Sequence, residues 1–408
     1  MQDSKLKDHQ HIGKELDLFS FHDIAPGAIF WHAKGFVIYK TLIEYLKSNL
    51  LKQGYEEIST PVLVKSSLFK KSGHWDFYSE NMFNFEHEKE SYSLKPMNCP
   101  EAALVFSSTK RSYKELPLRF AEFGILHRNE LSGVLGGAFR VRQFVIDDAH
   151  HFITTDQIQK EIHDLLIWSV EFYKGLGFKP EFFLATRPEK AMGDIKLWDL
   201  AEKALKQGLD DSKVKYSVKE KDGAFYGPKI DIHIKDSQDR DWQLATIQLD
   251  FQIPEKMDLN YIDSDGKLKR PVIVHRALLG SIERFIGILT EHFQGAFPLW
   301  LSPVQVSVLP VSEKHNEFSK EINDILVSEG FRSELDNSDN TVGSKIRNAT
   351  LQKVPFMLII GDKEVGKSGK NIKNLKEIYI SIRTREGQDL GFKNLYEFIQ
   401  TLKTQIEK

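Results

Sequence analysis

The sequence predicts an α+β fold with two main domains, because helices and strands follow each other differently in its two parts. Between residues 82 and 154, several short β-type runs occur without helices between them, which favours an antiparallel sheet over a Rossmann arrangement. From about residue 302, strand and helix patterns alternate, which is typical of a separate α/β domain. A chain of 408 residues is long enough for each domain to bury its own core.

In the first domain, hydrophobic spacing predicts a long amphipathic helix over residues 36–55, ending near Gly54. The run 56–64 that follows reads as a strand in which Pro61 favours an edge position. Helical periodicity returns over 155–210 and over 280–293. Strands are expected at 82–94, 116–130, 139–154, 223–236, 241–253 and 269–278.

In the second domain, strands and helices are expected to alternate up to a C-terminal helix. The strands are expected at 304–311, 355–365 and 377–387, and the preceding helices at 316–331 and 341–354. The expected organisation is therefore an N-terminal extension (1–20), a sheet domain (21–301) and an α/β domain (302–408).

Composition narrows the class of protein. The single cysteine excludes an internal disulfide framework, and the chain has neither an apolar run of membrane-spanning length nor a signal-peptide pattern. We therefore expect a cytoplasmic protein without a membrane partner. The net charge of −2 argues against broad nucleic-acid affinity, and DNA is not expected as a partner. Residues 341–385 nevertheless hold ten Lys or Arg against three acids, which indicates either a local basic face or a solvated surface.

Three side chains have the chemistry of a catalytic-type zinc site. Cys99, His150 and His275 would form a Cys/His/His set with one open coordination position. In a strand, Ile146, Asp148 and His150 share one face. The ligands are 51 and 125 residues apart, so the spacing carries no local signal, and a buried cysteine with a packing role is the alternative.

Arginines gather in a second group. Arg128, Arg140 and Arg142 flank a Gly-rich loop and would suit a polyphosphate, while Glu130 either accepts from an amino group or pairs with an arginine. Arg284 falls in the first turn of the helix over 280–293, where the positive end of the helix dipole also attracts anions.

Several longer segments carry a resemblance to a known family. "TP" after a long helix, "HRNE" with "RVRQF", and "GSIERF" resemble motifs 1, 2 and 3 of class II aminoacyl-tRNA synthetases, in that order. "GHWDFY", "KPMNCP", "DDAH", "GAFYGPK" and "QLDF" are similar to segments of the threonyl-tRNA synthetase family, and "KVPFMLIIGDKEV" and "ISIRTREG" to its anticodon-binding domain. The resemblance covers residues 8–408 and implies a class II antiparallel core followed by that domain.

The resemblance implies a function and its residues. This function is the activation of L-threonine with ATP and Mg²⁺, followed by transfer of the threonyl group to the 3′ end of tRNA(Thr). The resemblance also implies a homodimer formed through the motif 1 region. One zinc ion per chain would be held by Cys99, His150 and His275 and would select threonine over valine. Residues implied to bind the substrate are Met97, Asp148, Tyr226, Lys229, Gln243 and Ser281.

The family's remaining roles also fall on residues of this chain. Arg128 would hold the α-phosphate of ATP and Arg140 the γ-phosphate, Phe144 and Arg284 would sandwich adenine, and Glu130 would read its amino group. His74 would assist attack by the terminal ribose, so Arg128, Arg284 and His74 are the implied catalytic residues. Glu364 and Arg383 would contact the anticodon.

The chain departs from the family pattern in three places. It begins just before the catalytic core, so we expect no editing domain and accumulation of seryl-tRNA. Ile146 stands where the family usually has glutamine, which predicts weaker threonine binding or altered inhibitor sensitivity. Residues 366–376 lengthen a loop of the anticodon domain, where added lysines either contact phosphate or are solvated.

Three alternatives to a housekeeping enzyme stay open. One is an adenylate-forming paralogue that charges no tRNA, another is a resistance-type second copy, and the third is a non-catalytic regulatory paralogue. His74 and the anticodon-type domain argue against the first. The full set of arginines and zinc ligands argues against the third.

Overall fold

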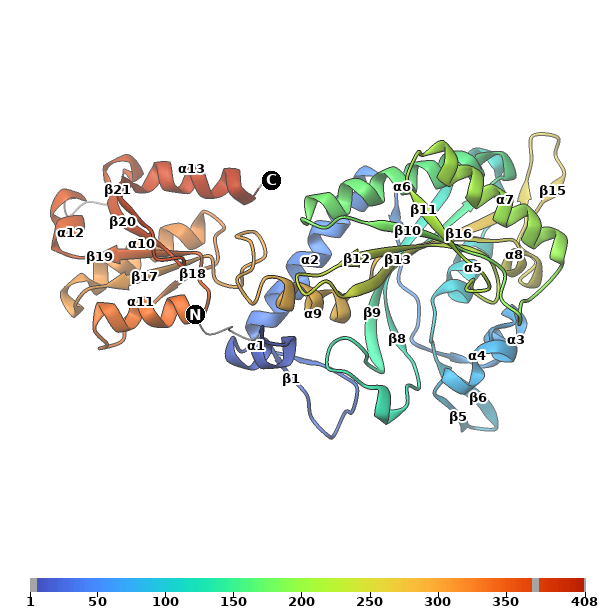
Figure 1. The fold of residues 1–408 in the computed structure, drawn as a ribbon, viewed down its shortest axis with the longest axis horizontal. Helices are drawn as coiled ribbons and strands as arrows, with labels where there is room; N and C mark the ends of the chain where they lie inside the picture. The colour runs from blue at the N-terminus through green and yellow to red at the C-terminus, as the bar shows by residue number, and fades with distance from the viewer. Residues whose placement is uncertain (1–5, 369–373, 407–408) are drawn as a thin grey trace. The chain divides into compact units, whose positions relative to one another are not determined.

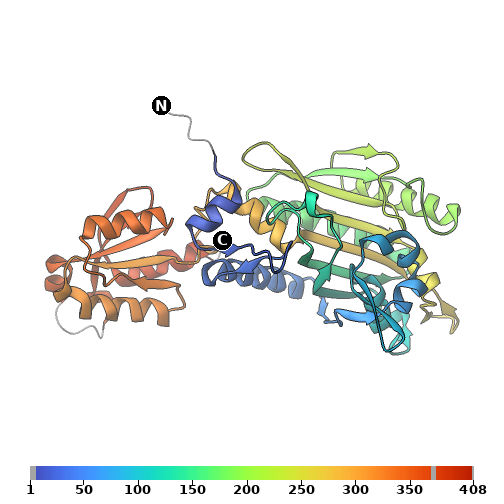
Figure 2. The same cartoon turned by 90° about the horizontal axis from the view of Figure 1, so that it is seen from below.

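The computed structural model describes residues 6–368 and 374–406, and the chain folds into two compact units (Figures 1 and 2). The larger unit comprises residues 21–29 and 46–288, and the smaller unit comprises the described residues 6–20, 30–45, 289–368 and 374–406. Helices α2 (Ala33–Lys52) and α9 (Ile282–His292) contribute residues to both. Among the described residues, no helix is both long and apolar enough to cross a membrane.

The larger unit is built on an eight-stranded sheet whose central strands are all antiparallel, as the sequence predicts. Only the outermost pairs, β11 with β10 and β3 with β8, run parallel. In spatial order the strands are β11 (Tyr216–Lys219), β10 (Glu181–Ala185), β12 (Lys229–Lys235), β13 (Asp241–Asp250), β16 (Val272–Ser281), β9 (Gln143–Ile153), β8 (Leu118–His127) and β3 (Glu56–Glu57).

One face of this sheet is covered by helix α6 (Ile158–Gly175). His151 of β9 lies on that face, where its ring contacts the Glu161 carboxylate at 2.9 Å and the Tyr55 hydroxyl at 2.8 Å. Helix α7 (Ile195–Asp211) packs against α6, and Gly208 makes room for the Ile162 side chain. The other face, which we call the site face, carries Ile146, Asp148 and His150, so the predicted alternation is confirmed.

Shorter elements complete the part of this unit that the structure describes. Two three-stranded sheets have the orders β4-β6-β5 and β15-β14-β7. Their strands are β4 (Leu63–Lys65), β5 (Asn84–His87), β6 (Glu90–Leu94), β7 (Arg111–Ser112), β14 (Tyr261–Ile262) and β15 (Leu268–Lys269). The short helices are α3 (Ser67–Ser72), α4 (His74–Tyr78), α5 (Cys99–Ser107) and α8 (Gln252–Lys256).

Three expectations for this unit are wrong. Helix α5 lies between β6 and β8, where the sequence predicted no helix. The strand expected over 56–64 is two short strands, β3 and β4, in different sheets. Between them the Thr60 amide and hydroxyl both donate to the Glu122 carboxylate, at 2.8 and 2.9 Å, while the Ile58 amide still donates to the Ala121 carbonyl oxygen of β8. The ladder to β8 therefore ends before Thr60, which bonds to a side chain. The helical region expected over 155–210 is interrupted by β10, a short buried run that pairs with β11 and β12.

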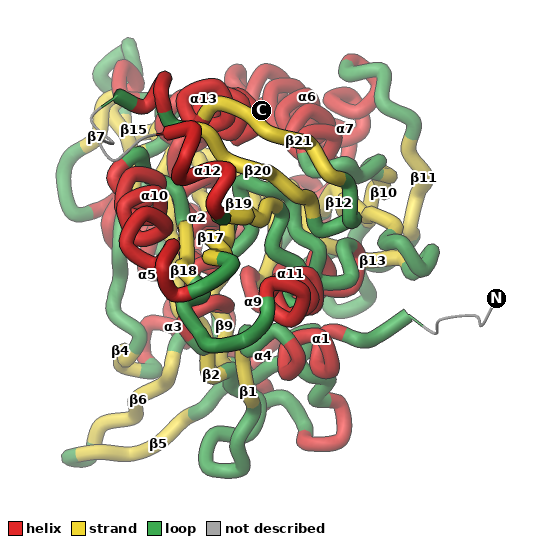
Figure 3. The backbone as a smooth tube through the Cα atoms, turned by 90° about the vertical axis from the view of Figure 1, so that its left-hand side faces the viewer, coloured by secondary structure: helices red, strands yellow, loops and turns green. Residues whose placement is uncertain are grey.

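The smaller unit contains the predicted α/β domain. Its five-stranded sheet has the order β18 (Ser333–Leu335), β17 (Val306–Pro310), β19 (Phe356–Ile360), β20 (Tyr379–Thr384) and β21 (Asp389–Asn394). The first three strands are parallel, and β20 and β21 are antiparallel additions. Figure 3 shows helices alternating with these strands, namely α10 (Asn316–Ser328), α11 (Val342–Leu351), α12 (Asp362–Ser368) and α13 (Leu395–Ile406). The sequence did not predict β18 and β21.

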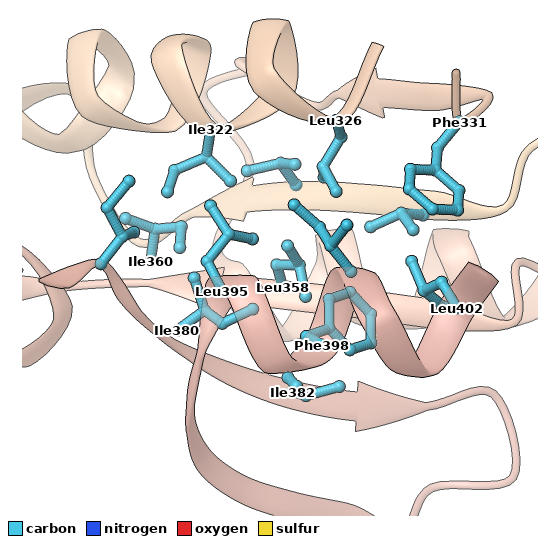
Figure 4. Close-up of a cluster of buried hydrophobic side chains, with 14 of the residues drawn as sticks. Ile322, Leu326, Phe331, Leu358, Ile360, Ile380, Ile382, Leu395, Phe398 and Leu402 are labelled. Atoms are coloured by element: carbon cyan, nitrogen blue, oxygen red, sulfur yellow. The ribbon is translucent and has the colours of Figure 1, made fainter. Parts of the chain in front are cut away.

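Helices on one face of this sheet enclose an apolar core (Figure 4). Ile322 and Leu326 of α10 and Phe398 of α13 point toward Leu358 and Ile380 of the sheet. The N-terminal part of the same unit contains α1 (His9–Glu15) and the hairpin-like pair β1 (Phe19–Ser20) and β2 (Phe30–Trp31). Lys370 and Lys373, which belong to the lengthened loop, lie outside the described residues.

Candidate active site

An arginine-lined cavity of about 310 Å³ opens on the site face of the larger unit. Arg128 follows β8, Arg140 lies in the loop between β8 and β9, and Arg284 lies in the first turn of α9, as predicted. Burial and the neighbouring Arg128 and Arg140 charges lower the pKa of Arg284. Like charges are costly to hold together in a partly buried space, so the cavity is suited to a polyanion.

Aromatic and acidic side chains complete the wall of this first cavity. The Arg128 guanidinium lies 5.0 Å from the centre of the Phe144 ring, and Arg284 lines the same cavity. The Glu130 carboxylate accepts from Arg140 Nε at 2.9 Å, which is the ion pair that the sequence left open as an alternative. Arg142 instead donates to the Glu130 carbonyl oxygen and does not line the cavity.

A second cavity of about 300 Å³ adjoins the first. Arg128, Ile146, Thr246, Gln248 and Ala277 line both cavities, so the two spaces meet along β9, β13 and β16. The second cavity is also lined by Met97, Asp148 and Tyr226, which are implied to bind the substrate, and by the implied metal ligands Cys99 and His275. The predicted site residues therefore converge, although they come from distant parts of the chain.

The three candidate metal ligands come together at this second cavity. The ligand atoms of Cys99, His150 and His275 lie within 4.8 Å of one another, and all three residues are buried. His150 and His275 are directly opposite in the β9–β16 register, and Cys99 begins helix α5. A thiol with two imidazoles is a donor set that suits zinc and leaves a position for a further ligand.

Unpartnered nitrogens support a metal site more specifically than proximity does. His275 Nε2 lies 2.9 Å from the Asp250 carboxylate, which leaves its Nδ1 buried without a partner among the described residues. His150 Nε2 is likewise buried and unpartnered. Burial lowers the pKa of His150, so this imidazole is neutral and its nitrogen lone pair is available. Burial also raises the pKa of the Cys99 thiol, so a cation is needed to stabilise the thiolate.

Asp148 is held beside these ligands by a side-chain hydrogen bond. The Asn98 amide donates to Asp148 Oδ2 at 3.1 Å, and Asp148 Oδ2 lies 4.0 Å from His150 Nε2. Gly124 allows this arrangement, because a Cβ atom there would lie 2.2 Å from Asn98 Oδ1. A carboxylate at the edge of the second cavity is available to a substrate ammonium or hydroxyl group.

Four other predicted residues take different positions. Gln243 and Ser281 line the first cavity, whereas Lys229 lines neither and forms an ion pair with Asp231 at 2.5 Å. His74 begins helix α4, and its ring centre lies 6.2 Å from that of Tyr226. Burial lowers the pKa of His74 to about 3, so its imidazole is neutral.

The two residues implied to contact the anticodon differ in accessibility. Glu364 is buried, and its carboxylate accepts from the Gly361 amide at 2.8 Å and from the Ser381 hydroxyl at 2.6 Å. Arg383 is exposed on β20, two residues beyond Ser381. Arg383 is therefore the more accessible of the two side chains in this structure.

Gln248 is a site residue that the sequence reasoning missed. It lines both cavities, accepts from the Tyr226 hydroxyl, and lies directly opposite His275 in the β13–β16 register. The signal was present in the segment "QLDF", but the position of Gln248 opposite a candidate metal ligand depends on strand register, which the sequence alone does not supply.

Comparison with known protein families gives a family match for each of two long segments of the chain. Residues 83–293 match the family model for the tRNA synthetase class II core domain (G, H, P, S and T), and residues 305–402 match the model for an anticodon binding domain. Among curated proteins, the chain is 50% identical over 406 residues to a threonine–tRNA ligase of Caldanaerobacter subterraneus and 47% identical over 408 residues to one of Carboxydothermus hydrogenoformans. These matches cover all of this chain but only 62% and 63% of the relatives' own lengths.

Solved structures agree with this assignment. A structure described as the RNA binding domain of threonyl-tRNA synthetase from Cryptosporidium parvum has a TM-score of 0.93 and 39% identity, with 98% of each chain covered. A structure described as a putative threonyl-tRNA synthetase from Aeropyrum pernix has a TM-score of 0.82 and 27% identity, with 98% of this chain and 96% of that chain covered.

Proposed function

The chain belongs to the class II tRNA synthetases and, within them, to the threonyl-tRNA synthetase family; from this premise we propose that it joins L-threonine to tRNA(Thr). The reaction would use ATP to form threonyl-adenylate and would then transfer the threonyl group to the terminal ribose. Residues 21–301 would carry this chemistry, and residues 302–408 would bind the anticodon stem, with Arg383 as a contact. The active form would be a homodimer.

The second cavity would select the amino acid. A zinc ion held by Cys99, His150 and His275 would offer its open position to the amino group and side-chain hydroxyl of threonine. Asp148 and the Tyr226 hydroxyl would orient the substrate amino group from the cavity wall, the amine binding the metal in its neutral form. Valine has no hydroxyl oxygen, and an apolar pocket separates such near isosteres only about 100-fold, so polar contacts to the hydroxyl supply the missing discrimination.

The first cavity would hold ATP next to the amino acid. Arg128 lines both cavities, so its guanidinium would lie where the threonine carboxylate attacks the α-phosphorus. Arg140 and Arg284 would bind the remaining phosphates and the adenine, with Phe144 as the opposing ring. Mg²⁺ bound with ATP would offset part of the phosphate charge. Activation then depends on positioning and charge stabilisation more than on covalent help from the protein.

Transfer would use His74 as the base. The terminal ribose oxygen would bond to the threonyl carbonyl carbon, its proton would pass to His74 Nε2, and AMP would leave as the carbonyl–phosphate bond breaks. The role is supported by His74 Nε2, which is buried and has no hydrogen-bond partner among the described residues.

The convergence of Cys99, His150 and His275 beside an arginine-lined cavity is the observation that carries the proposal. ATP–pyrophosphate exchange with threonine, valine and serine tests the activation step, followed by charging of tRNA(Thr). Exchange with threonine but not valine, together with charging, is expected. Exchange without charging would instead support the adenylate-forming alternative, and no exchange with threonine would refute the proposal.

A further inference from the structure

Ser72 makes two contacts at the end of helix α3, two residues before the candidate base His74. Its hydroxyl oxygen lies 2.9 Å from His74 Nδ1 and 3.3 Å from the Phe69 carbonyl oxygen. Ser72 and His74 are both fully buried, so no water competes for these contacts. The two residues are held close because Gly73, between them, adopts a left-handed conformation with φ of 83°.

Counting hydrogens assigns the direction of both hydrogen bonds. A serine hydroxyl has one hydrogen to donate, whereas a carbonyl oxygen can only accept. Both contacts of Ser72 are therefore satisfied only if its hydrogen goes to Phe69 and the His74 Nδ1–H donates to the Ser72 oxygen. The proton of a neutral imidazole then resides on Nδ1, and Nε2 keeps a free lone pair.

The other ring nitrogen is consistent with this assignment. His74 Nε2 is buried and has no hydrogen-bond partner among the described residues. The rings of Phe225 and Tyr226 lie beside the imidazole, with centroids 5.4 and 6.2 Å away, and both residues line the second cavity. An unsatisfied Nε2 lone pair beside these aromatic rings is costly, and such a group in a folded protein calls for an explanation. Acceptance of a substrate proton at Nε2 provides one.

We infer that Ser72 is a positioning residue for the transfer step, because it fixes the His74 tautomer in which Nε2 accepts the proton of the tRNA ribose. This inference rests on the proposed role of His74 and deepens it. Without the Ser72 hydroxyl, the proton of His74 is free to occupy Nε2, and an imidazole with Nε2–H cannot accept a proton there. Amino-acid activation does not involve this nitrogen and is unaffected.

Two variants of equal shape provide the test. Ser72→Thr keeps the hydroxyl and Ser72→Val replaces it with a methyl group, so any packing disturbance at this buried position is shared. Single-turnover transfer from enzyme-bound threonyl-adenylate to tRNA(Thr) is measured beside ATP–pyrophosphate exchange. We expect transfer by Ser72→Val to be at least about tenfold slower than by Ser72→Thr, while exchange differs by less than about twofold.

Two further variants separate the possible failures. Ser66→Ala removes another buried serine hydroxyl next to the same helix, one that contacts Ser91 and Ser93 but no histidine, and it should leave transfer unchanged. His74→Ala tests the proposed base itself. If His74→Ala transfers at the normal rate, the role of His74 fails; if only His74→Ala is slow and Ser72→Val is not, the role of Ser72 fails. Equal losses of exchange and transfer in Ser72→Val would show a structural role and overturn the inference.

A direct measurement remains decisive should Ser72→Val fail to fold. ¹⁵N NMR of histidine-labelled wild-type protein identifies the protonated ring nitrogen, with His74→Gln used to assign the signal. Protonation at Nδ1 supports the inference, and protonation at Nε2 overturns it.

Discussion

Replacing Asp250 by Asn tests whether His275 is a metal ligand through Nδ1. Asp250 is fully buried, and its two oxygens have separate partners. Oδ1 accepts from the Gln252 and Ile253 amides at 2.7 and 3.0 Å, and Oδ2 lies 2.9 Å from His275 Nε2. An asparagine keeps Oδ1 on the backbone amides, so its NH₂ group must face His275. Two donors would then meet, unless the imidazole proton moves to Nδ1.

That proton shift removes the lone pair that we assign to the metal. If the proton instead stays on His275 Nε2, the asparagine NH₂ group and Nε2–H face each other as two buried donors without an acceptor. Such an unsatisfied contact costs about 1–3 kcal/mol. We therefore expect Asp250→Asn to weaken zinc binding about 10–100-fold, or about 1.4–2.7 kcal/mol. The loss should also reduce the preference for threonine over valine, because the open metal position no longer distinguishes the hydroxyl.

The assay is competition for zinc with a chromophoric chelator, followed by ATP–pyrophosphate exchange with the two amino acids. Asp236→Asn is the matched control, because Asp236 is also buried and accepts from Arg240 and Trp242 but contacts none of the candidate ligands. Both variants should unfold cooperatively. If Asp250→Asn folds and holds zinc as tightly as the wild type, the assignment of Nδ1 as the ligand is wrong.

Three other changes have expected outcomes. Ile146→Gln adds an amide on the sheet face that carries Asp148. A new hydrogen bond from this amide to threonine, of about 0.5–1.5 kcal/mol, would lower the KM for threonine about 2–12-fold. An unchanged KM and an unchanged inhibitor response would count against this hydrogen bond. Gly124→Ala displaces Asn98 from Asp148 and should raise that KM about fivefold with little change in kcat, whereas an equal fall in folding stability and kcat would indicate packing alone. Burial raises the pKa of Glu283 to about 7. The folded protein therefore keeps a proton on Glu283 that the unfolded chain loses above about pH 4.5, so the free energy of unfolding falls as pH rises between these two values. Glu283→Gln should therefore stabilise the protein at pH 8 by at most about 3 kcal/mol and little at pH 4, as measured by urea unfolding; an equal effect at both pH values would refute this.

The spacing of residues along the sequence predicted those helices and strands that depend only on neighbouring residues. Helix α2 follows from apolar spacing, the shared face of Ile146, Asp148 and His150 follows from the two-residue period of a strand, and Arg284 falls in the first turn of α9 as expected. The run 56–64 was misread because its propensity is that of one strand, while Thr60 in its middle donates to the Glu122 side chain. Propensity does not reveal such a long-range partner.

The candidate site was predictable only in part from the residues themselves. Arginines around a Gly-rich loop indicated an anion site, but the convergence of Cys99 with two distant histidines came from the family resemblance. Gln248 was missed altogether, and so was the ion pair that holds Lys229 away from both cavities. The place of Gln248 depends on which strands are neighbours, and hydrophobic alternation does not specify the order of strands in a sheet. Lys229 and Asp231 are instead two residues apart on one face of β12.

Strand register connects the fold to the proposed chemistry. His150 faces His275 across the β9–β16 pair, whereas its neighbour His151 lies on the opposite face and is bonded to Glu161 and Tyr55. A slip of one residue between these strands would place His151 opposite His275 and turn every side chain of β9 to the other face. The same slip would separate Asp147 from Arg276 and from the Leu278 and Leu279 amides, which would leave buried polar groups unsatisfied. These buried contacts therefore also fix which imidazole reaches the candidate metal site, so the candidate site needs no local motif of its own.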